Sequence, residues 1–291
     1  MTFSIVATDE TDVGVAVASK FIAVGAIVPQ AKAGIGAVAT QCYANPRLGS
    51  LILKLLESGL NANDALIKAL GEDSGREERQ LGVVSIRGDA AAYTGSKCPE
   101  YAGHIVGSGY AVQGNILAGP EVLERMARAF EAKRGELVDK LLEALSAGDA
   151  AGGDRRGGKQ SAAIIVLRPG GGYLGLTDTY VDLRVDDHPD PPVSELRRLF
   201  SIWELTLLSR EDPNDVVLKS NVALTVQRIL KGLGLYSGDV NGNWDEATEE
   251  AFRAWAGLEN FENKVRNDDK IWGGSVYRYL INEARRRGII D

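Results

Sequence analysis

The sequence predicts an α+β fold in which two antiparallel sheets are covered by helix layers, followed by a small helical domain. The strand-like segments come in hairpins, and the helix-like segments come in pairs between those hairpins. Since strands and helices do not alternate one by one, a doubly wound parallel sheet is excluded, and two sheets with helix layers are the expected packing. A change of composition near residue 210 predicts the second domain.

Turn residues separate the expected strands and pair them into hairpins. The segment DETDVG at 9–14 joins the first two strands, Arg87-Gly88-Asp89 joins another pair, and PGGG at 169–172 joins a third. We expect strands at residues 3–7, 13–18, 34–43, 80–86, 90–94, 104–115, 162–168 and 173–185.

Helical periodicity and capping residues define the expected helices. Leu48, Ile52 and Leu55 fall on one face of the first helix, and Asn61 is placed to cap the second. Pro120 lies in the first turn of the third helix, a favoured position for proline. We expect helices at residues 46–58, 61–70, 119–133, 136–147 and 193–208.

Composition excludes several classes of protein. The chain has 291 residues, of which 44% are apolar and 25% charged, as is ordinary for a soluble globular protein. Its net charge of −7 and pI of about 5.1 argue against nucleic-acid binding, because such domains are usually basic. No apolar run approaches the ~20 residues that span a bilayer. The start MTFSIVATDE lacks the basic region of a secretory signal, so we expect a cytoplasmic protein with no membrane partner.

Residues 1–210 and 211–291 are expected to form separate domains. All nine prolines lie at or before Pro213, whereas three of the four tryptophans lie after it. The segment SREDPND at 209–215 combines acids, proline and asparagine, which is typical of a linker. The first domain would contain the sheets, and the second would be mostly helical.

Thr2 is the most informative position for chemistry. Methionine before a small residue is normally excised, so the mature chain would begin with Thr2 at the start of a strand. A free α-amine has a pKa near ~7.7–8.0 and takes the proton of the threonine hydroxyl as an internal general base. Thr2 is therefore a candidate nucleophile. The alternative is an ordinary Met-Thr start without a catalytic role.

Six segments resemble, in order, the family called domain of unknown function 1028. They are TFSIVATDE, VGVAVASKFIAVGA, GIGAVATQCYANPRLG, YAVQGNILAGPEV, AGGDRRGGKQSAA and VDLRVDDHPDP, and together they cover about residues 2–200. The resemblance implies a fold like that of the N-terminal-nucleophile (Ntn) hydrolases, a four-layer αββα sandwich in which the nucleophile begins a strand. It leaves the substrate open.

Two lysines and an asparagine are candidates for assisting Thr2. In proteasome-like enzymes, which share this resemblance, a lysine close to the threonine lowers its proton affinity. Lys20 would take that role, since it ends the second expected strand, which the hairpin returns toward Thr2. Lys32 is the second candidate for that role, and a solvated strand end is the alternative for either lysine. Asn115, before the helix that starts near Gly119, is placed to hold the oxyanion with nearby backbone N–H groups, or serves only as a turn residue.

Two segments are candidates for substrate binding. Thr40 and Gln41 end a strand of small residues, which lets a ligand or another segment approach the backbone closely. In the loop GGDRRGGKQS at 152–161, Asp154 beside Arg155 and Arg156 indicates an ordered ionic arrangement that presents guanidinium groups to a carboxylate. The alternative for this loop is a flexible polar connector.

No metal and no cofactor are expected. The pattern most like a metal site is an acidic cluster with one histidine: Asp182, Asp186, Asp187, His188 and Asp190. Prolines at 189, 191 and 192 favour instead a rigid exit from the strand into the last helix. Cys42 and Cys98 have no metal-ligand spacing and are expected as small buried apolar residues.

The second domain resembles the peptidoglycan-binding repeat over about residues 220–256. The matching residues are Gln227, Gly234, Tyr236, Gly238, Asn241, Gly242, Thr248 and Phe252. The chain departs from the pattern at Trp255-Ala256, where the repeat has Phe-Gln, and Asp245 is expected to cap the second helix. The resemblance implies binding of cell-wall muropeptides. In a cytoplasmic protein the same unit would shape a substrate pocket or a dimer contact.

These features predict an Ntn-type amidohydrolase that acts on a small amide or a muropeptide-like substrate. Thr2 would attack, Lys20 would tune its amine, and Asn115 would hold the oxyanion. The alternative is a non-catalytic binding or assembly protein on the same fold, with a cell-wall-binding-like module. Broad apolar helix faces favour a homodimer or larger assembly, without nucleic-acid or membrane partners.

Overall fold

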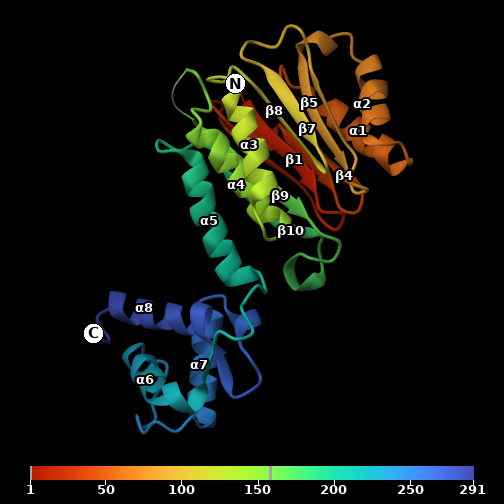
Figure 1. The fold of residues 1–291 in the computed structure, drawn as a ribbon. Helices are drawn as coiled ribbons and strands as arrows, with labels where there is room; N and C mark the ends of the chain where they lie inside the picture. The colour runs from red at the N-terminus through yellow and green to blue at the C-terminus, as the bar shows by residue number, and fades with distance from the viewer. Residues whose placement is uncertain (1, 157–158) are drawn as a thin grey trace. The chain divides into compact units, whose positions relative to one another are not determined.

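The computed structural model describes residues 2–156 and 159–291 (Figure 1). Met1, whose removal the sequence analysis expects, and Gly157 and Gly158 of the glycine-rich loop lie outside the described residues. The chain divides into two compact units, Met1–Phe200 and Ser201–Asp291. This division falls within helix α5 (Pro192–Leu207), ten residues before the boundary that composition predicts at residue 210.

A six-stranded antiparallel sheet contains the start of the chain. Its strands follow the order β10, β9, β2, β1, β8, β7. Their bounds are β1 Thr2–Thr8, β2 Val13–Ser19, β7 Gly103–Gly107, β8 Tyr110–Asn115, β9 Ser161–Leu167 and β10 Thr179–Val185. β1 pairs with β2 on one side and with β8 on the other, so that Thr2 lies opposite Ser19 and Asn115. Every residue of β1 and β2 is buried, as expected for strands covered on both faces.

A four-stranded antiparallel sheet, in the order β3, β4, β5, β6, forms the second layer of strands. Its strands are β3 Pro29–Lys32, β4 Gly36–Cys42, β5 Arg79–Ser85 and β6 Ala90–Thr94. Side chains alternate between the two faces of a strand. In β4, Val38 accordingly packs with the helices, whereas Ala37 and Ala39 pack with residues of the six-stranded sheet.

Helix pairs cover one face of each sheet, and the other two faces share a core (Figure 1). The covering helices are α1 Pro46–Glu57 and α2 Ala62–Gly71 on the four-stranded sheet, and α3 Glu121–Ala132 and α4 Leu137–Ala150 on the six-stranded sheet. α4 approaches β1 closely, since a Cβ added at Gly148 would lie 3.3 Å from Phe3 Cδ2. The apolar core between the sheets includes Val6, Val15 and Val84.

Capping side chains fix where several helices begin. Asn61 accepts a hydrogen bond from the backbone N–H of Asp64 at 2.8 Å, which confirms the expected cap of α2. Asn45 caps α1 in the same way, and Glu136 with Asp139 forms a capping box at α4.

Three strand expectations differ from the structure. The expected strand at 104–115 is the hairpin of β7 and β8, because Gly109 turns the chain with a φ of +73°. The expected strand at 173–185 begins only at Thr179, since Tyr173–Gly175 forms a 3-10 turn. The edge strand β3 was not expected, and it is short and begins with proline.

The second unit is mainly helical and has a two-stranded ladder. Its elements are β11 Val216–Leu218, α6 Lys219–Gly232, α7 Glu246–Leu258, the 3-10 turn Glu262–Lys264, β12 Lys270–Trp272, the π-helical turn Gly273–Tyr277 and α8 Arg278–Arg286. Gln227 of α6 is buried and organises the loop before α7. Its Oε1 accepts from the backbone N–H groups of Asn241 and Gly242, at 3.1 and 2.9 Å, and its Nε2 donates to Thr248 Oγ1 at 2.9 Å.

Asp245 caps α7 by accepting from the Thr248 N–H at 2.8 Å, as expected.

The two sheets and the helical second unit confirm an α+β chain with antiparallel sheets and a helical C-terminal region. Among the described residues, none of the helices has both the length and the apolar character needed to cross a bilayer.

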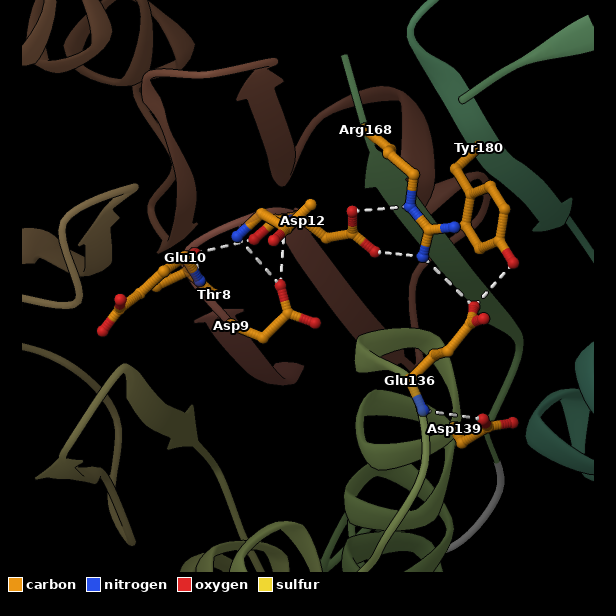
Figure 2. A network of polar contacts seen from close by, with 9 residues as sticks. Thr8, Asp9, Glu10, Asp12, Glu136, Asp139, Arg168 and Tyr180 are labelled. Carbon is orange, nitrogen blue, oxygen red and sulfur yellow. Dashed lines mark hydrogen bonds and ion pairs between the residues drawn. The ribbon is translucent and has the colours of Figure 1, made fainter. Parts of the chain in front are cut away.

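An ionic network ties four segments of the first unit together at the β1–β2 turn (Figure 2). Asp12 has a buried side chain and accepts from Arg168 Nε at 2.8 Å and Nη2 at 2.7 Å. Arg168 also pairs with Glu136 at 3.2 Å, and its guanidinium lies 3.7 Å from the ring centroid of Tyr180. Tyr180 OH donates to Glu136 Oε2 at 2.6 Å. The network therefore joins the β1–β2 turn, the residue that follows β9, strand β10 and the start of α4.

We expect Arg168→Met to lower the stability of the first unit by about 3–5 kcal/mol, because it leaves the buried Asp12 carboxylate without its partner. The measurement is the melting temperature of the first unit by calorimetry, which falls roughly 2–4 °C per kcal/mol in a unit of this size. Arg198→Met is the matched control, since Arg198 is exposed and pairs with Glu195 at the surface, where an ion pair adds little to stability. Equal shifts for the two variants would contradict the role assigned to the network.

Candidate active site

Polar side chains gather at one end of the layer between the two sheets. In β1, Thr2 and Ser4 point the same way as Val6, which belongs to the core between the sheets. The same alternation directs buried polar residues of five other strands into this layer: Ser19, Gln41, Gln80, Gln113, Asn115 and Ser161. The layer is therefore apolar at one end and polar at the other.

Gln80 is the centre of these contacts. Its Oε1 accepts from Gln41 Nε2 and from Asn115 Nδ2, both at 2.9 Å. Its Nε2 donates to the carbonyl oxygen of Gly114 at 2.7 Å. Since Gln80 belongs to β5, whereas Asn115 and Gly114 belong to β8, Gln80 joins one sheet to the other.

Ser4 makes a second connection between the sheets. Its hydroxyl donates to Gln41 Oε1 at 2.8 Å and accepts from Gln113 Nε2 at 2.6 Å. We call Ser4, Gln41, Gln80, Gln113 and Asn115 the amide network. All five residues are buried, so these hydrogen bonds replace those that water would make, whereas Gln113 Oε1 is buried without a partner among the described residues.

Thr2 lies beside the amide network and on the wall of a pocket. It is 8% exposed, and its Oγ1 lies 3.1 Å from Ser19 Oγ. Its carbonyl oxygen accepts a long hydrogen bond of 3.5 Å from Gln41 Nε2. The pocket has a volume of about 480 Å³, which lies within the ~300–1,000 Å³ typical of small-molecule sites. The pocket lining also includes Ser19, Lys20, Gln41, Cys42 and Arg156.

The two candidate lysines lie in different places. Lys20 lines the pocket and is exposed. Lys32 ends β3 and pairs with Glu57 of α1 at 2.5 Å, and it does not line the pocket. The geometry therefore favours Lys20 over Lys32 as a cation near Thr2.

Thr40 and Asn115 do not line the pocket, although the sequence analysis places both in the site. Thr40 alternates with Gln41 and so faces the helix layer, where its Oγ1 donates to the carbonyl oxygen of Asn45 at 3.4 Å. Asn115 lies opposite Thr2 in the ladder, but its Nδ2 donates to Gln80. Gln41 is the member of the amide network that lines the pocket.

The glycine-rich loop brings Arg156 to the pocket and buries Asp154. Asp154 accepts from Arg156 Nε at 3.2 Å, from Nη2 at 3.0 Å and from the backbone N–H at 2.8 Å. The guanidinium is therefore held in a defined orientation against a buried carboxylate. Arg155 is exposed and does not line the pocket.

Cys42 lies in the candidate site, although its sequence context predicts only a small buried apolar residue. This residue lines the pocket and has a φ of +67°, in the left-handed region that non-glycine residues rarely adopt. A hydrogen bond with Cys98 lowers the pKa of the Cys42 thiol, and the same contact together with burial raises the pKa of Cys98. Fifty-five residues separate the two cysteines in the chain, so spacing gave no signal of their contact.

The acidic cluster after β10 makes local contacts. Arg184 pairs with Asp186 at 3.3 Å, and His188 Nδ1 lies 3.2 Å from the carbonyl oxygen of Asp190. Within residues 2–156 and 159–291, no group of three or more His, Cys, Asp or Glu side chains is arranged to hold a metal ion.

We expect iodoacetamide to modify Cys42 before Cys98, because a lowered pKa gives more thiolate at a given pH. The rate at Cys42 should rise with pH around a midpoint below that of a free cysteine. Cys98→Ala removes the hydrogen bond and should move that midpoint upward. Mass spectrometry of the modified peptides at several pH values measures this, and an unchanged midpoint in Cys98→Ala would contradict the assignment.

Comparison with known proteins identifies both parts of the chain. A search of curated proteins finds no match. Among solved structures, protein SPO2555 from Silicibacter pomeroyi, described as DUF1028, has 34% sequence identity and a TM-score of 0.64, over 70% of this chain and 86% of that chain. Anbu, the ancestral beta-subunit from Yersinia bercovieri, has 9% identity and a TM-score of 0.32 over 69% of this chain and 93% of that chain, which is too weak to support an argument.

Two family models match along the chain. Residues 206–280 match the model described as "Putative peptidoglycan binding domain", so the resemblance predicted for the second domain is confirmed. Residues 2–196 match the model described as "Family of unknown function (DUF1028)". Because this match covers two thirds of the chain and agrees with the similarity to SPO2555, the chain belongs to the DUF1028 family.

Proposed function

We propose that this chain is an N-terminal-nucleophile amidohydrolase in which Thr2 is the nucleophile. One observation carries the proposal: Thr2 is the first residue of the central strand β1 and lies on the wall of the 480 Å³ pocket. A nucleophile must be reachable by substrate and held in one orientation. Thr2 meets both conditions, because it borders the pocket and its hydroxyl is within hydrogen-bond distance of Ser19.

The arrangement of helices and sheets supports the proposal. From one side to the other, the first unit has the α3–α4 pair, the six-stranded sheet, the four-stranded sheet and the α1–α2 pair. We interpret this order as the αββα sandwich of the Ntn hydrolases. In that class the nucleophile begins a strand, which is the position of Thr2 in β1.

The proposed reaction requires that the mature chain begins at Thr2. The Thr2 α-amine takes the hydroxyl proton while Oγ1 attacks the carbonyl carbon of the amide. The C–N bond breaks, and the departing amine receives that proton. Water then attacks the ester on Oγ1, with the same α-amine as base, and releases the carboxylic acid. In total, one amide and one water give one acid and one amine.

Ser19 and Lys20 assist Thr2 in this proposal. Ser19 Oγ, 3.1 Å from Thr2 Oγ1, orients the hydroxyl for attack. Lys20 adds a positive charge to the pocket lining, which lowers the proton affinity of the α-amine. An amine with a lower pKa is less protonated at neutral pH and is therefore available as a base.

Gln41 is a better candidate than Asn115 for holding the oxyanion. Gln41 lines the pocket, and its Nε2 donates to Gln80 at 2.9 Å and makes a second, long bond of 3.5 Å to the Thr2 carbonyl. That bond is weak enough to be exchanged for one to a developing oxyanion. Asn115 does not line the pocket and donates to Gln80 at 2.9 Å, so its role is to hold the amide network in place.

Replacement of the nucleophile tests the proposal. We expect Thr2→Ala to lower kcat/KM for amide hydrolysis by at least about a thousand-fold, whereas Thr2→Ser keeps measurable activity because serine retains hydroxyl and amine. The assay follows release of primary amine from N-acyl amino acids. Equal activity of wild type and Thr2→Ala would remove Thr2 from the mechanism.

The matched control uses no substitution. Protein produced while methionine aminopeptidase is inhibited keeps Met1, so the α-amine belongs to Met1 and we expect no activity. Intact mass measures the N-terminal state of each preparation. Full activity with Met1 retained would rule out the α-amine as base.

A second function is proposed for the second unit, because residues 206–280 match a peptidoglycan-binding domain model. This unit has its own pocket of about 320 Å³, lined by residues that include Leu205, Leu208, Gly274 and Ser275. Ser275 Oγ is buried without a hydrogen-bond partner, so it has donor and acceptor capacity for a ligand. We propose that this pocket binds a cell-wall fragment.

We expect the full chain to bind muramyl dipeptide and Ser275→Trp, which fills the pocket, to bind it at least about ten-fold more weakly. Ser237→Trp is the control, because Ser237 is exposed and does not line the pocket. Calorimetric titration measures the affinities. Equal binding by the two variants would exclude this pocket as the site.

A further inference from the structure

The Thr2 pocket has a large apolar part that amide hydrolysis by itself does not require. Two short segments supply it: residues 21–28, which follow β2, and residues 43–44, which follow β4. From the first segment Phe21, Ile27 and Val28 line the pocket, and from the second Tyr43. We call these two segments the apolar walls.

The first apolar wall is fixed by contacts with β9 and with the chain after β10. The N–H of Val24 donates to Ser161 Oγ at 3.1 Å, and the N–H of Ala23 donates to the carbonyl oxygen of Asp186 at 2.8 Å. Gly25 packs so closely that a Cβ there would lie 2.6 Å from Ala163 Cβ. The backbone of this wall is therefore held in place while Phe21 and Ile27 extend outward.

The second apolar wall is fixed by Arg79. Its Nη1 donates to the carbonyl oxygen of Tyr43 at 2.8 Å, and the N–H of Tyr43 donates to the carbonyl of Glu78 at 3.1 Å. Arg79 Nε in turn donates to Asp73 at 2.8 Å, and this contact lowers the pKa of Asp73 to about 2. The pair stays ionised at neutral pH, so the anchor of Tyr43 persists.

Large apolar side chains on these walls remain exposed. Phe21 is 52% exposed, Ile27 is 38% exposed and Tyr43 is 61% exposed. Exposed apolar groups that cluster around a pocket mark a contact site, because covering them removes apolar area from water. Because the backbone of both walls is fixed by hydrogen bonds and the apolar side chains face outward, the walls form a preformed surface to which an apolar group of a ligand can bind.

The charged part of the pocket favours an anionic group of a ligand instead of an apolar one. Arg156 is oriented by its bidentate pair with the buried Asp154, and Lys20 is a second cation in the lining. A guanidinium carries five N–H donors, so two bonds to Asp154 do not exhaust it. Such a group recognises a carboxylate through charge-assisted hydrogen bonds.

We propose that the Thr2 pocket takes a small amide with a bulky apolar acyl group and a carboxylate, the chemistry of an N-acyl amino acid. This inference rests on the proposed amidohydrolase function. The acyl group contacts Phe21, Ile27 and Tyr43, and the carboxylate on the amine side of the scissile bond meets Arg156. Hydrolysis consumes one water and releases the apolar carboxylic acid and the amino acid. Sugar-bearing muropeptides fit this pocket poorly, because the apolar walls offer few hydrogen bonds to hydroxyl groups.

The test separates binding from chemistry by using Thr2→Ala, which binds without turnover. Four probes are titrated by calorimetry: N-phenylacetylglycine, its carboxamide, N-acetylglycine and muramyl dipeptide. N-phenylacetylglycine has both groups, and each other probe lacks the carboxylate or the apolar acyl group, or carries a sugar. We expect N-phenylacetylglycine to bind at least about ten-fold more tightly than the carboxamide and N-acetylglycine, since each of those probes loses one of the two interactions.

Two variants assign the groups to their subsites. Tyr43→Ser should weaken the binding of N-phenylacetylglycine and leave the affinity for N-acetylglycine unchanged. Ile67→Ser in α2 is the control, because Ile67 is 60% exposed and lies outside the pocket. Asp154→Asn with Arg156→Gln removes the pair without leaving a buried charge, and should abolish the preference for the carboxylate over the carboxamide.

Each outcome is decisive. Equal binding of the first three probes would overturn the proposed ligand class. So would muramyl dipeptide binding more tightly than N-phenylacetylglycine, if Tyr43→Ser weakens that binding. Selective binding by Thr2→Ala, with no hydrolysis by the mature wild type, would support the ligand class and contradict the proposed amidohydrolase function.

Discussion

The structure depends on burying amide side chains between two sheets. A buried amide without a partner costs roughly 1–3 kcal/mol, so each member of the amide network must meet its partner. Gln80 of β5 meets Asn115 and Gly114 of β8, and Ser4 of β1 meets Gln41 of β4. A slip of one residue in any of these strands would turn the amides to the opposite face. The hydrogen bonds therefore set the position of one sheet relative to the other, which apolar packing of valine and alanine would specify less strictly.

The same constraint holds the candidate active site in place. The end of a strand near a chain terminus tends to fray, yet Thr2 pairs with Ser19 on one side and with Asn115 on the other. Its carbonyl is also within reach of Gln41. Thr2 is thus held at a fixed position beside the pocket. The other groups of the pocket lining, the apolar walls and the Asp154–Arg156 pair, are themselves held by hydrogen bonds. These side chains therefore lose little conformational freedom when a ligand binds, and such preorganisation would favour the proposed reaction at Thr2.

Much of the fold could be predicted from short sequence patterns, whereas the side-chain contacts of the candidate site could not. Hairpin turns, the Asn61 and Asp245 caps and the two family resemblances all lie within short stretches of sequence. Alternation in β4 could have separated Thr40 from Gln41, but periodicity does not say which face meets the other sheet. Gln80 and Ser4 were missed because their partners lie 35 and 37 residues away in the chain. The contact between Cys42 and Cys98 also joins residues that lie far apart in the chain, and the bond that directs Asn115 to Gln80 leaves no signal in the sequence.

Mapping of an acyl intermediate tests the proposed role of Thr2 as the nucleophile, oriented by these contacts. The mature protein, with intact mass confirming Thr2 as its first residue, is treated with p-nitrophenyl phenylacetate, and its peptides are analysed by mass spectrometry. We expect one phenylacetyl group on the N-terminal peptide, as an ester on Thr2 Oγ1 that hydroxylamine removes. Acylation at another residue, with the N-terminal peptide unmodified, would contradict the proposed role of Thr2.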